Sequence, residues 1–250
     1  MTILYAIFIF IFGSLFTSFF HVLAVRIPKG ETLLGTSHCD HCERKLRLVD
    51  VLPIIGFVIN KGKCHNCGVK IGVKHLIYEI IGGSLFTLSF LLYGFTIDFY
   101  ILIILLSVLL IESIVDIDSM IVIDRIWMIG IIPILLIRIL DQEIWPYILS
   151  SAVLFVLLFL IATLAKAYYK KDALGAGDVK LYIFIGLFLK FPQGVLSLFL
   201  ASLFGLIYGI IFMKEKDKYL PLVPFISLSV YICYLYGEQM IDWYLKLLGM

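Results

Sequence analysis

The chain has 250 residues, of which 62% are hydrophobic and only 15% charged, and its mean hydropathy is +1.08. Soluble domains are nearly half apolar and about a quarter charged, so this composition excludes an ordinary soluble enzyme and makes lipid the main solvent. The net charge of +2 at pH 7 is too small to indicate a partner. We expect a lipid-bilayer protein that has no nucleic-acid partner.

Uncharged stretches predict where the chain crosses the bilayer, because a helix needs roughly 20 apolar residues to span it. Three weaker stretches lie between the strong ones; two of them are interrupted by Glu112 and Arg138, and the third is short. The strong stretches are Thr2–Val25, Ile80–Ile97, Ile144–Ala165, Phe191–Met213 and Tyr219–Gly237, and the weak ones are Phe99–Val115, Ile126–Leu140 and Leu181–Lys190. The prediction is an all-α polytopic membrane protein with about eight transmembrane helices. The first stretch is too long for a signal peptide and lacks a cleavage site, so we expect it to be retained.

The positions of Lys and Arg predict the orientation of these helices. With eight spans, seventeen of the 20 basic residues fall on one side of the membrane. They lie in the segment Arg26–Lys74, at Arg125, in Lys166–Lys180 and in Lys214–Lys218. Cytoplasmic loops carry such an excess. We therefore expect this side to face the cytoplasm, with both termini outside.

The one sizeable polar segment, at about residues 26–75, contains two C-x-x-C pairs. Cys39 and Cys42 form the first pair, and Cys64 and Cys67 form the second. Two such pairs suit a tetrahedral zinc site, and four thiolates leave no position for a catalytic water. The segment is predicted to be a small cytoplasmic insert closed by structural Zn²⁺.

The cysteines allow other interpretations. Disulfides are disfavoured in the cytoplasm, and a redox motif needs only one pair. His38, His41 or His65 could replace a cysteine as a ligand, although solvated loop residues are the simpler interpretation.

Two aspartates stand out at the ends of apolar stretches. Asp116 lies in Ser113-Ile-Val-Asp-Ile-Asp118 and Asp178 in Gly175-Ala-Gly-Asp-Val-Lys180. A carboxylate costs roughly 2.5–3.5 kcal/mol at mid-bilayer and less near the interface, so two of them on the cytoplasmic side suggest a paired-carboxylate hydrolase. In such a pair one carboxylate activates water while the other, protonated, polarises the scissile carbonyl.

Neighbouring residues refine this hypothesis. Gly175 and Gly177 allow positive φ and the close approach of another backbone; the simpler alternative makes Asp178 a helix N-cap. Asp124 is expected to cap the next helix or to pair with Arg125. Glu112 lies one helical turn before Asp116 and on the same face.

These motifs resemble the bacterial type IV prepilin peptidases, membrane aspartyl proteases of the G-x-G-D kind. The resemblance covers nearly the whole chain. It is carried by Ser18-Phe-Phe-His-Val-Leu-Ala-Val-Arg-Ile-Pro28, Ser37-His-Cys-x-x-Cys42, Leu52-Pro53, Lys61-Gly-Lys-Cys-x-x-Cys67, Tyr78-Glu79, Asp116-Ile-Asp118, Asp124 and Gly175-Ala-Gly-Asp-Val-Lys180.

The resemblance implies that Asp116 and Asp178 are catalytic, supported by Gly175, Gly177, Asp124 and Lys180. The substrates would be prepilins or pseudopilins, cut after a short basic leader at the cytoplasmic face of a bacterial inner or plasma membrane. Many members also methylate the new N-terminus with S-adenosylmethionine. Residues 1–98 would form the methyltransferase-associated part and residues 99–250 the peptidase core.

The chain departs from the family pattern at three places. Thr17 replaces a glycine and His21 an asparagine, and Val122-Ile-Asp124 replaces the usual L-P-D. A proton-coupled transporter or channel, with Glu112, Asp116 and Asp178 as a relay, is the main alternative, although transporters place such acids near mid-membrane. The second alternative is a zinc-binding scaffold protein without catalytic activity.

Overall fold

The chain folds into α-helices in the computed structural model, which describes residues 1–33, 35–39, 41–170, 174–213 and 220–249. These residues contain ten helices and two isolated β-bridges, but no strand. The helices are α1 (Thr2–Lys29), α2 (Leu48–Val51), α3 (Ile55–Ile59), α4 (Lys74–Tyr93), α5 (Ile97–Ser119), α6 (Asp124–Leu140), α7 (Ile144–Tyr169), α8 (Ala176–Ile185), α9 (Phe191–Phe212) and α10 (Val223–Leu247). The all-α prediction is confirmed. Contacts divide the chain into two units, Met1–Ile103 and Ile104–Met250.

The predicted membrane spans all coincide with helices, which differ in length and apolar character. Each of the eight expected segments overlaps a helix, but among the described residues only α1, α4, α5, α7 and α9 are long and apolar enough to cross a membrane. With 10 residues, α8 reaches only about 15 Å at 1.5 Å per residue, half of the bilayer core. Lys171 and the stretch Lys214–Lys218, which contribute to the predicted orientation, lie outside the described residues.

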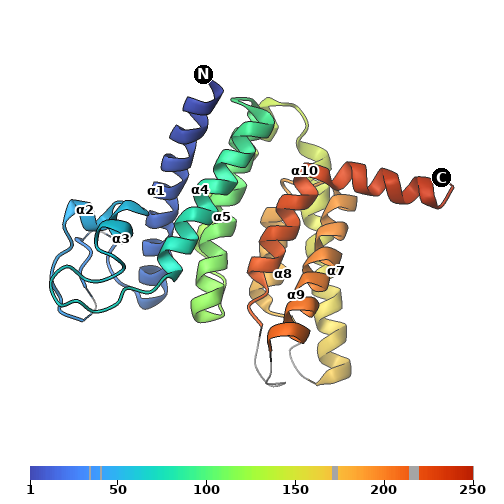
Figure 1. Ribbon diagram of the computed structural model, residues 1–250. Coiled ribbons are helices and arrows are strands. Elements are labelled where there is room, and N and C mark those ends of the chain that lie inside the picture. Colours follow the sequence, from blue (N-terminus) through green and yellow to red (C-terminus); the bar gives the residue numbers. More distant parts are fainter. Residues whose placement is uncertain (34, 40, 171–173, 214–219, 250) are drawn as a thin grey trace. The chain divides into compact units, whose positions relative to one another are not determined.

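In the first unit, α1 and α4 pack side by side (Figure 1). Small residues allow this contact: a Cβ on Gly13 would lie 3.1 Å from the Cα of Gly83. Close packing of small residues is how membrane helices associate without a hydrophobic driving force. Thr17 is fully buried, donates a hydrogen bond to the carbonyl oxygen of Gly13 at 2.8 Å and faces Gly82. The absence of a side chain at Gly82 thus makes room for the threonine.

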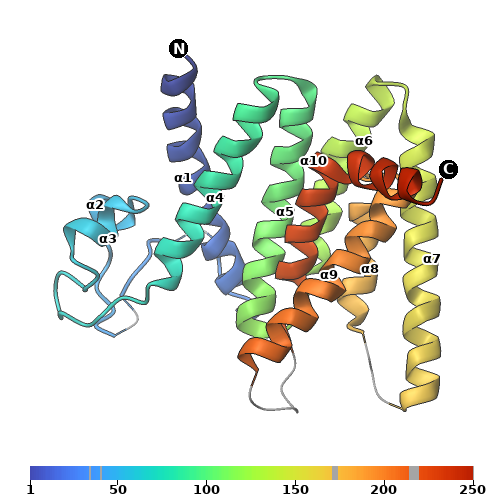
Figure 2. The ribbon, with the colours of Figure 1, turned by 45° about the vertical axis from the view of Figure 1, so that its right-hand side comes forward.

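In the second unit, the acidic residues of interest lie at the C-terminus of α5 and at the N-termini of α6 and α8, and the N-terminus of α10 lies against Asp116. α5 and α10 are joined by a 2.8 Å hydrogen bond between Ser113 Oγ and Ser227 Oγ. α6 approaches α5 and α8 at Gly130, where a Cβ would lie 2.6 Å from Val108 and 2.8 Å from Phe184. α9 lies beside α10 (Figure 2). This packing brings the ends of helices that are distant in sequence together.

The carbonyl groups at the end of α8 and in the turn that follows it are bonded by backbone N–H groups of that turn and by side chains of other helices. Ser151 Oγ donates to the carbonyl oxygen of Ile183 at 2.6 Å and Ser150 Oγ to that of Leu189 at 2.7 Å. Arg138, only 6% exposed, donates from Nε to the carbonyl oxygen of Leu187 at 3.4 Å. Its guanidinium also lies 3.5 Å from the ring centroid of Tyr147. The helix can therefore end inside the protein without unpaired carbonyl groups.

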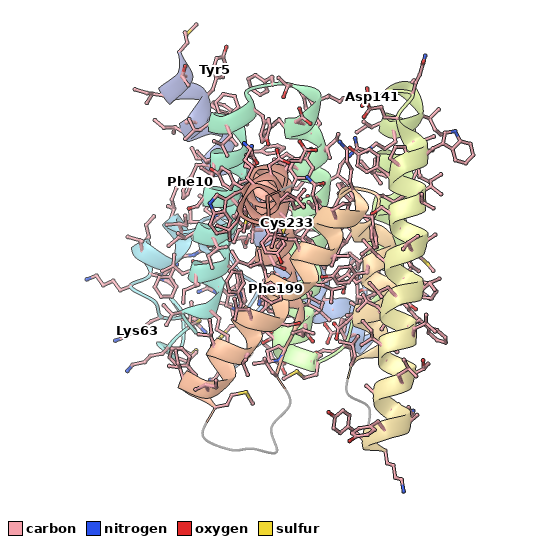
Figure 3. The ribbon with its side chains drawn as sticks, turned by 90° about the vertical axis from the view of Figure 1, so that its right-hand side faces the viewer. Tyr5, Phe10, Lys63, Asp141, Phe199 and Cys233 are labelled. Carbon is pink, nitrogen blue, oxygen red and sulfur yellow. The ribbon has the colours of Figure 1, made fainter. Side chains whose placement is uncertain are left out.

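The outward face of α7 is apolar. Leu149 and Leu164 are 64% and 69% exposed, and side chains project along the whole length of the helix (Figure 3). Asp141, in the turn that precedes α7, lies at the opposite end of this unit from the C-terminus of α7 (Figure 3). A continuous apolar surface of this kind is suited to lipid rather than to water.

Candidate active site and metal centre

The four cysteines of the insert meet at one point. Their sulfur atoms all lie within 4.8 Å of one another; Cys39 Sγ is 4.0 Å from Cys67 Sγ, and Cys42 Sγ is 3.9 Å from Cys64 Sγ. None of these thiols is in a disulfide. A tetrahedron with Zn–S bonds of about 2.3 Å has S–S edges of about 3.8 Å. The cluster therefore fits a metal ion such as zinc, and no histidine belongs to it among the described residues.

Each C-x-x-C pair sits in the same kind of turn. Cys39 N–H donates to Arg44 O and Glu43 N–H to Cys39 O; Cys64 N–H donates to Val69 O and Gly68 N–H to Cys64 O. Glu43 and Gly68 occupy the same place in the two turns and both have positive φ, at 53° and 70°. Backbone N–H groups of Cys67 and Asn66 lower the pKa of Cys64 below its usual value, which favours the thiolate that a metal binds.

Asp50 and Glu79 hold the rest of the insert together. Asp50 accepts hydrogen bonds from the side chains of Arg44 and Arg47 at 2.9 and 3.0 Å and from Asn60 Nδ2 at 2.9 Å. The Arg47 side chain is the main reason why the pKa of Asp50 lies far below its ordinary value. Glu79 on α4 accepts the N–H of Ile54 at 2.8 Å. The sequence patterns indicated Glu79 only as a neighbour of Tyr78; its contact with the insert comes from the structure.

Asp116 lies in the last turns of α5 and is 7% exposed. Its Oδ2 accepts the backbone N–H of Val223, at the start of α10, at 2.9 Å. Its carbonyl oxygen accepts the N–H of Met120 at 2.9 Å. The carboxylate is thus oriented by a backbone donor from another helix. Asp118, two residues further on, is exposed.

Asp178 is the third residue of α8 and is half-buried. The charge of Asp116 acts on Asp178, so the two carboxyl groups lie within electrostatic range of each other, although they come from different helices. Gly175, rather than Asp178, is the N-cap of α8.

The two glycines before Asp178 allow close approach but not unusual backbone angles. Gly175 has φ −63°, and neither it nor Gly177 is among the residues with positive φ, so their freedom to adopt positive φ is not used. A Cβ on Gly177 would lie 2.7 Å from Val122 Cβ, and one on Gly175 would lie 2.8 Å from Asp178 Oδ2. Glycine is needed here because neighbouring atoms fill the space.

Asp124 and Lys180 form an ion pair at 2.7 Å between the first turns of α6 and α8. Asp124 also accepts the indole N–H of Trp127 at 3.3 Å. The expected capping role is not observed, since α6 has no side-chain cap, and the partner is Lys180 instead of Arg125. Both side chains of the pair are partly exposed.

Glu112 is fully buried on α5, one turn before Asp116. Its Oε2 accepts the N–H of Ile123 at 2.9 Å, while its Oε1 has no hydrogen-bond partner among the described residues. Sequence reasoning placed Glu112 on the face of Asp116 but gave it no partner.

The structure thus describes a helical membrane protein with a Cys₄ cluster in one unit and approaching aspartates in the other. The model of the bacterial peptidase A24 N-terminal domain matches residues 11–93, and that of the type IV leader peptidase family matches residues 103–210. No solved structure matches the chain.

Curated relatives agree with these matches. The chain is 30% identical to a prepilin leader peptidase/N-methyltransferase of Bacillus subtilis over 96% of its own length and 97% of the relative. It is 32% identical to a type 4 prepilin-like proteins leader peptide-processing enzyme of Escherichia coli O78:H11, covering 78% and 74% of the two chains. A Neisseria gonorrhoeae prepilin leader peptidase/N-methyltransferase is 25% identical over 94% and 93%. The chain belongs to the type IV leader peptidase family, a family of aspartic peptidases.

Proposed function

We propose that this protein cleaves the short basic leader from prepilins or pseudopilins, with Asp116 and Asp178 as the catalytic pair. The proposal is supported by two observations: these carboxyl groups, on different helices, lie near enough for the charge of Asp116 to act on Asp178, and Val223 N–H holds Asp116 at 2.9 Å. Like charges at short range cannot both ionise easily, so such a pair shares one proton.

That shared proton supports a hydrolytic mechanism. The ionised carboxylate takes a proton from water, which then attacks the scissile carbonyl carbon, and the protonated partner donates a hydrogen bond to the carbonyl oxygen. Val223 N–H keeps Asp116 oriented. The absence of side chains at Gly175 and Gly177 lets Asp178 Oδ2 and Val122 lie close to the start of α8. The pair of Asp124 and Lys180 links α6 to α8, the helix that carries Asp178.

A second activity, N-methylation of the new N-terminus from S-adenosylmethionine, is proposed from the names of the relatives. We assign it to the part formed by residues 1–98 and the peptidase to residues 99–250. Structural zinc on Cys39, Cys42, Cys64 and Cys67 would hold the insert closed, since four thiolates leave no site for a reacting water.

We further propose that the enzyme lies in the bacterial inner or plasma membrane with the aspartates on the cytoplasmic side. The excess of Lys and Arg in the segments on that side supports this orientation. The leader of a prepilin is then cut before the pilin leaves the membrane.

The test is cleavage of a pilin-like substrate by purified protein in detergent or proteoliposomes. Asp116→Asn and Asp178→Asn should each abolish cleavage, and the double variant should be no worse, because the two act as one unit. Asp118→Asn is the matched control, since this aspartate follows on the same helix and is exposed; it should stay near wild-type activity. Near-normal cleavage by either single variant would remove that residue from the pair.

A proton-flux assay on the wild-type protein in vesicles tests the transporter alternative. A proton relay through Glu112, Asp116 and Asp178 predicts proton flux into vesicles and no leader cleavage. Cleavage without flux in the wild-type protein would reject it.

A further inference from the structure

The segment between α5 and α6, residues 120–123, contacts both helices that carry the aspartates. Met120 begins it with positive φ, at 54°. Val122 contacts α8 so closely that a Cβ on Gly177 would lie 2.7 Å from Val122 Cβ and 3.6 Å from its backbone nitrogen. Gly177 immediately precedes Asp178. The position of this connector therefore bears directly on the position of Asp178.

On the other side, the connector is tied to α5 by Glu112. The 2.9 Å bond from Ile123 N–H to Glu112 Oε2 is the hydrogen bond of a side chain that is otherwise enclosed by protein. Glu112 and Asp116 are four residues apart on one helix, so they move together. A carboxyl group in this apolar interior is costly, and its one described bond is made to the connector.

We propose that Glu112 is a positioning residue for the aspartate pair. Through Ile123 it fixes the connector, and through the contact of Val122 with Gly177 the connector sets where Asp178 stands relative to Asp116. This role rests on the proposed peptidase function. It requires an acceptor oxygen at residue 112, and it requires neither a negative charge nor an exchangeable proton there.

Glutamine and leucine separate these requirements. Glu112→Gln keeps an oxygen that can accept the Ile123 N–H, whereas Glu112→Leu fills similar space without an acceptor. Ser113→Ala is the matched control, because it removes a buried side-chain hydrogen bond of the same helix that leads to Ser227 on α10 and not to the connector.

We expect Glu112→Gln to retain kcat within about threefold and to keep the wild-type pH profile. Glu112→Leu should lower kcat by about tenfold or more with little change in KM, since misplacement of a catalytic group by about 1 Å can cost about 100-fold. Ser113→Ala should stay within about threefold. The proposal is overturned if glutamine is as damaging as leucine, or if leucine is harmless.

A second measurement does not depend on peptidase activity. Hydrogen–deuterium exchange of peptides covering residues 120–124 should be faster in Glu112→Leu and unchanged in Glu112→Gln and Ser113→Ala. Unchanged exchange in Glu112→Leu would overturn the positioning role. If exchange is faster in Glu112→Leu but the wild-type protein cleaves no prepilin, the link between Glu112 and the connector stands and the proposed peptidase function is contradicted.

Discussion

Gly177→Ala is predicted to damage catalysis although alanine is the better helix former. Gly177 is the second residue of α8, and its φ is not positive. Alanine would therefore favour the helix by up to about 1 kcal/mol. Its Cβ, however, would lie 2.7 Å from Val122 Cβ and 2.9 Å from Val122 Cγ2. Relief of such overpacking costs about 1–3 kcal/mol, so the steric clash should dominate.

The clash also predicts which second substitution restores activity. To reach an ordinary contact near 3.7 Å, the connector or α8 must shift by about 1 Å, and a shift of that size next to Asp178 should lower kcat by about 10- to 100-fold. Val122→Ala removes only the Cγ atoms and should restore little. Val122→Gly also removes the Cβ, which leaves the backbone nitrogen at 3.6 Å, and should restore more.

The assay is leader cleavage by purified variants, with thermal unfolding measured on the same samples. A Gly177→Ala protein that is more stable and fully active would refute the steric reasoning. Equal recovery with Val122→Ala and Val122→Gly would also refute it, because the Cβ–Cβ contact would then not be the limiting one.

Three further predictions concern pH, metal and the surface ion pair. Because two close carboxyl groups share one proton, kcat/KM should follow a bell-shaped pH profile and fall at high pH when that proton is lost; a rate that keeps rising to about pH 9 would contradict this. Elemental analysis should find one zinc per chain, and chelation should make the insert more sensitive to protease; zinc-free protein of equal resistance would contradict it. Asp124 and Lys180 have side chains 41% and 47% exposed, so their pair contributes about 1 kcal/mol at most. Asp124→Asn and Lys180→Met should therefore lower the unfolding temperature only slightly, and their effects should not add; large additive losses would be inconsistent with this.

Local patterns in the sequence predicted the parts of the structure that depend on local interactions. Uncharged stretches located the long helices, and the C-x-x-C spacing brought four sulfur atoms together because each pair lies within one tight turn. The length of α8 could not be inferred in the same way. Ser151 on α7 bonds to Ile183 near its carboxyl end, and Ser150 bonds to Leu189 in the turn that follows; no apolar stretch encodes these contacts.

The contacts that sequence reasoning missed are all made with connecting segments or distant helices. Ile54 with Glu79 and Ile123 with Glu112 are backbone-to-carboxyl bonds, whose partners depend on how the chain folds back. The sequence suggested an ion pair between Asp124 and its neighbour Arg125, but Asp124 pairs with Lys180, 56 residues away. In both cases a buried glutamate accepts a backbone N–H from a connecting segment. An acidic residue beside or inside an apolar stretch and close to a polar loop can therefore indicate a contact of this kind.

The short reach of α8 has a consequence for how the protein is made. A helix of 10 residues is too short to partition into the bilayer on its own, because it crosses only about half of the roughly 30 Å core. The carbonyl groups of Ile183 in α8 and of Leu187 and Leu189 in the turn after it have their side-chain donors on α7 and at Arg138 of α6. During biogenesis α7 and α6 must therefore already be in the membrane when α8 enters. Asp178 at its start would then reach its place only late in assembly, after the surrounding helices have formed the protein environment that receives it.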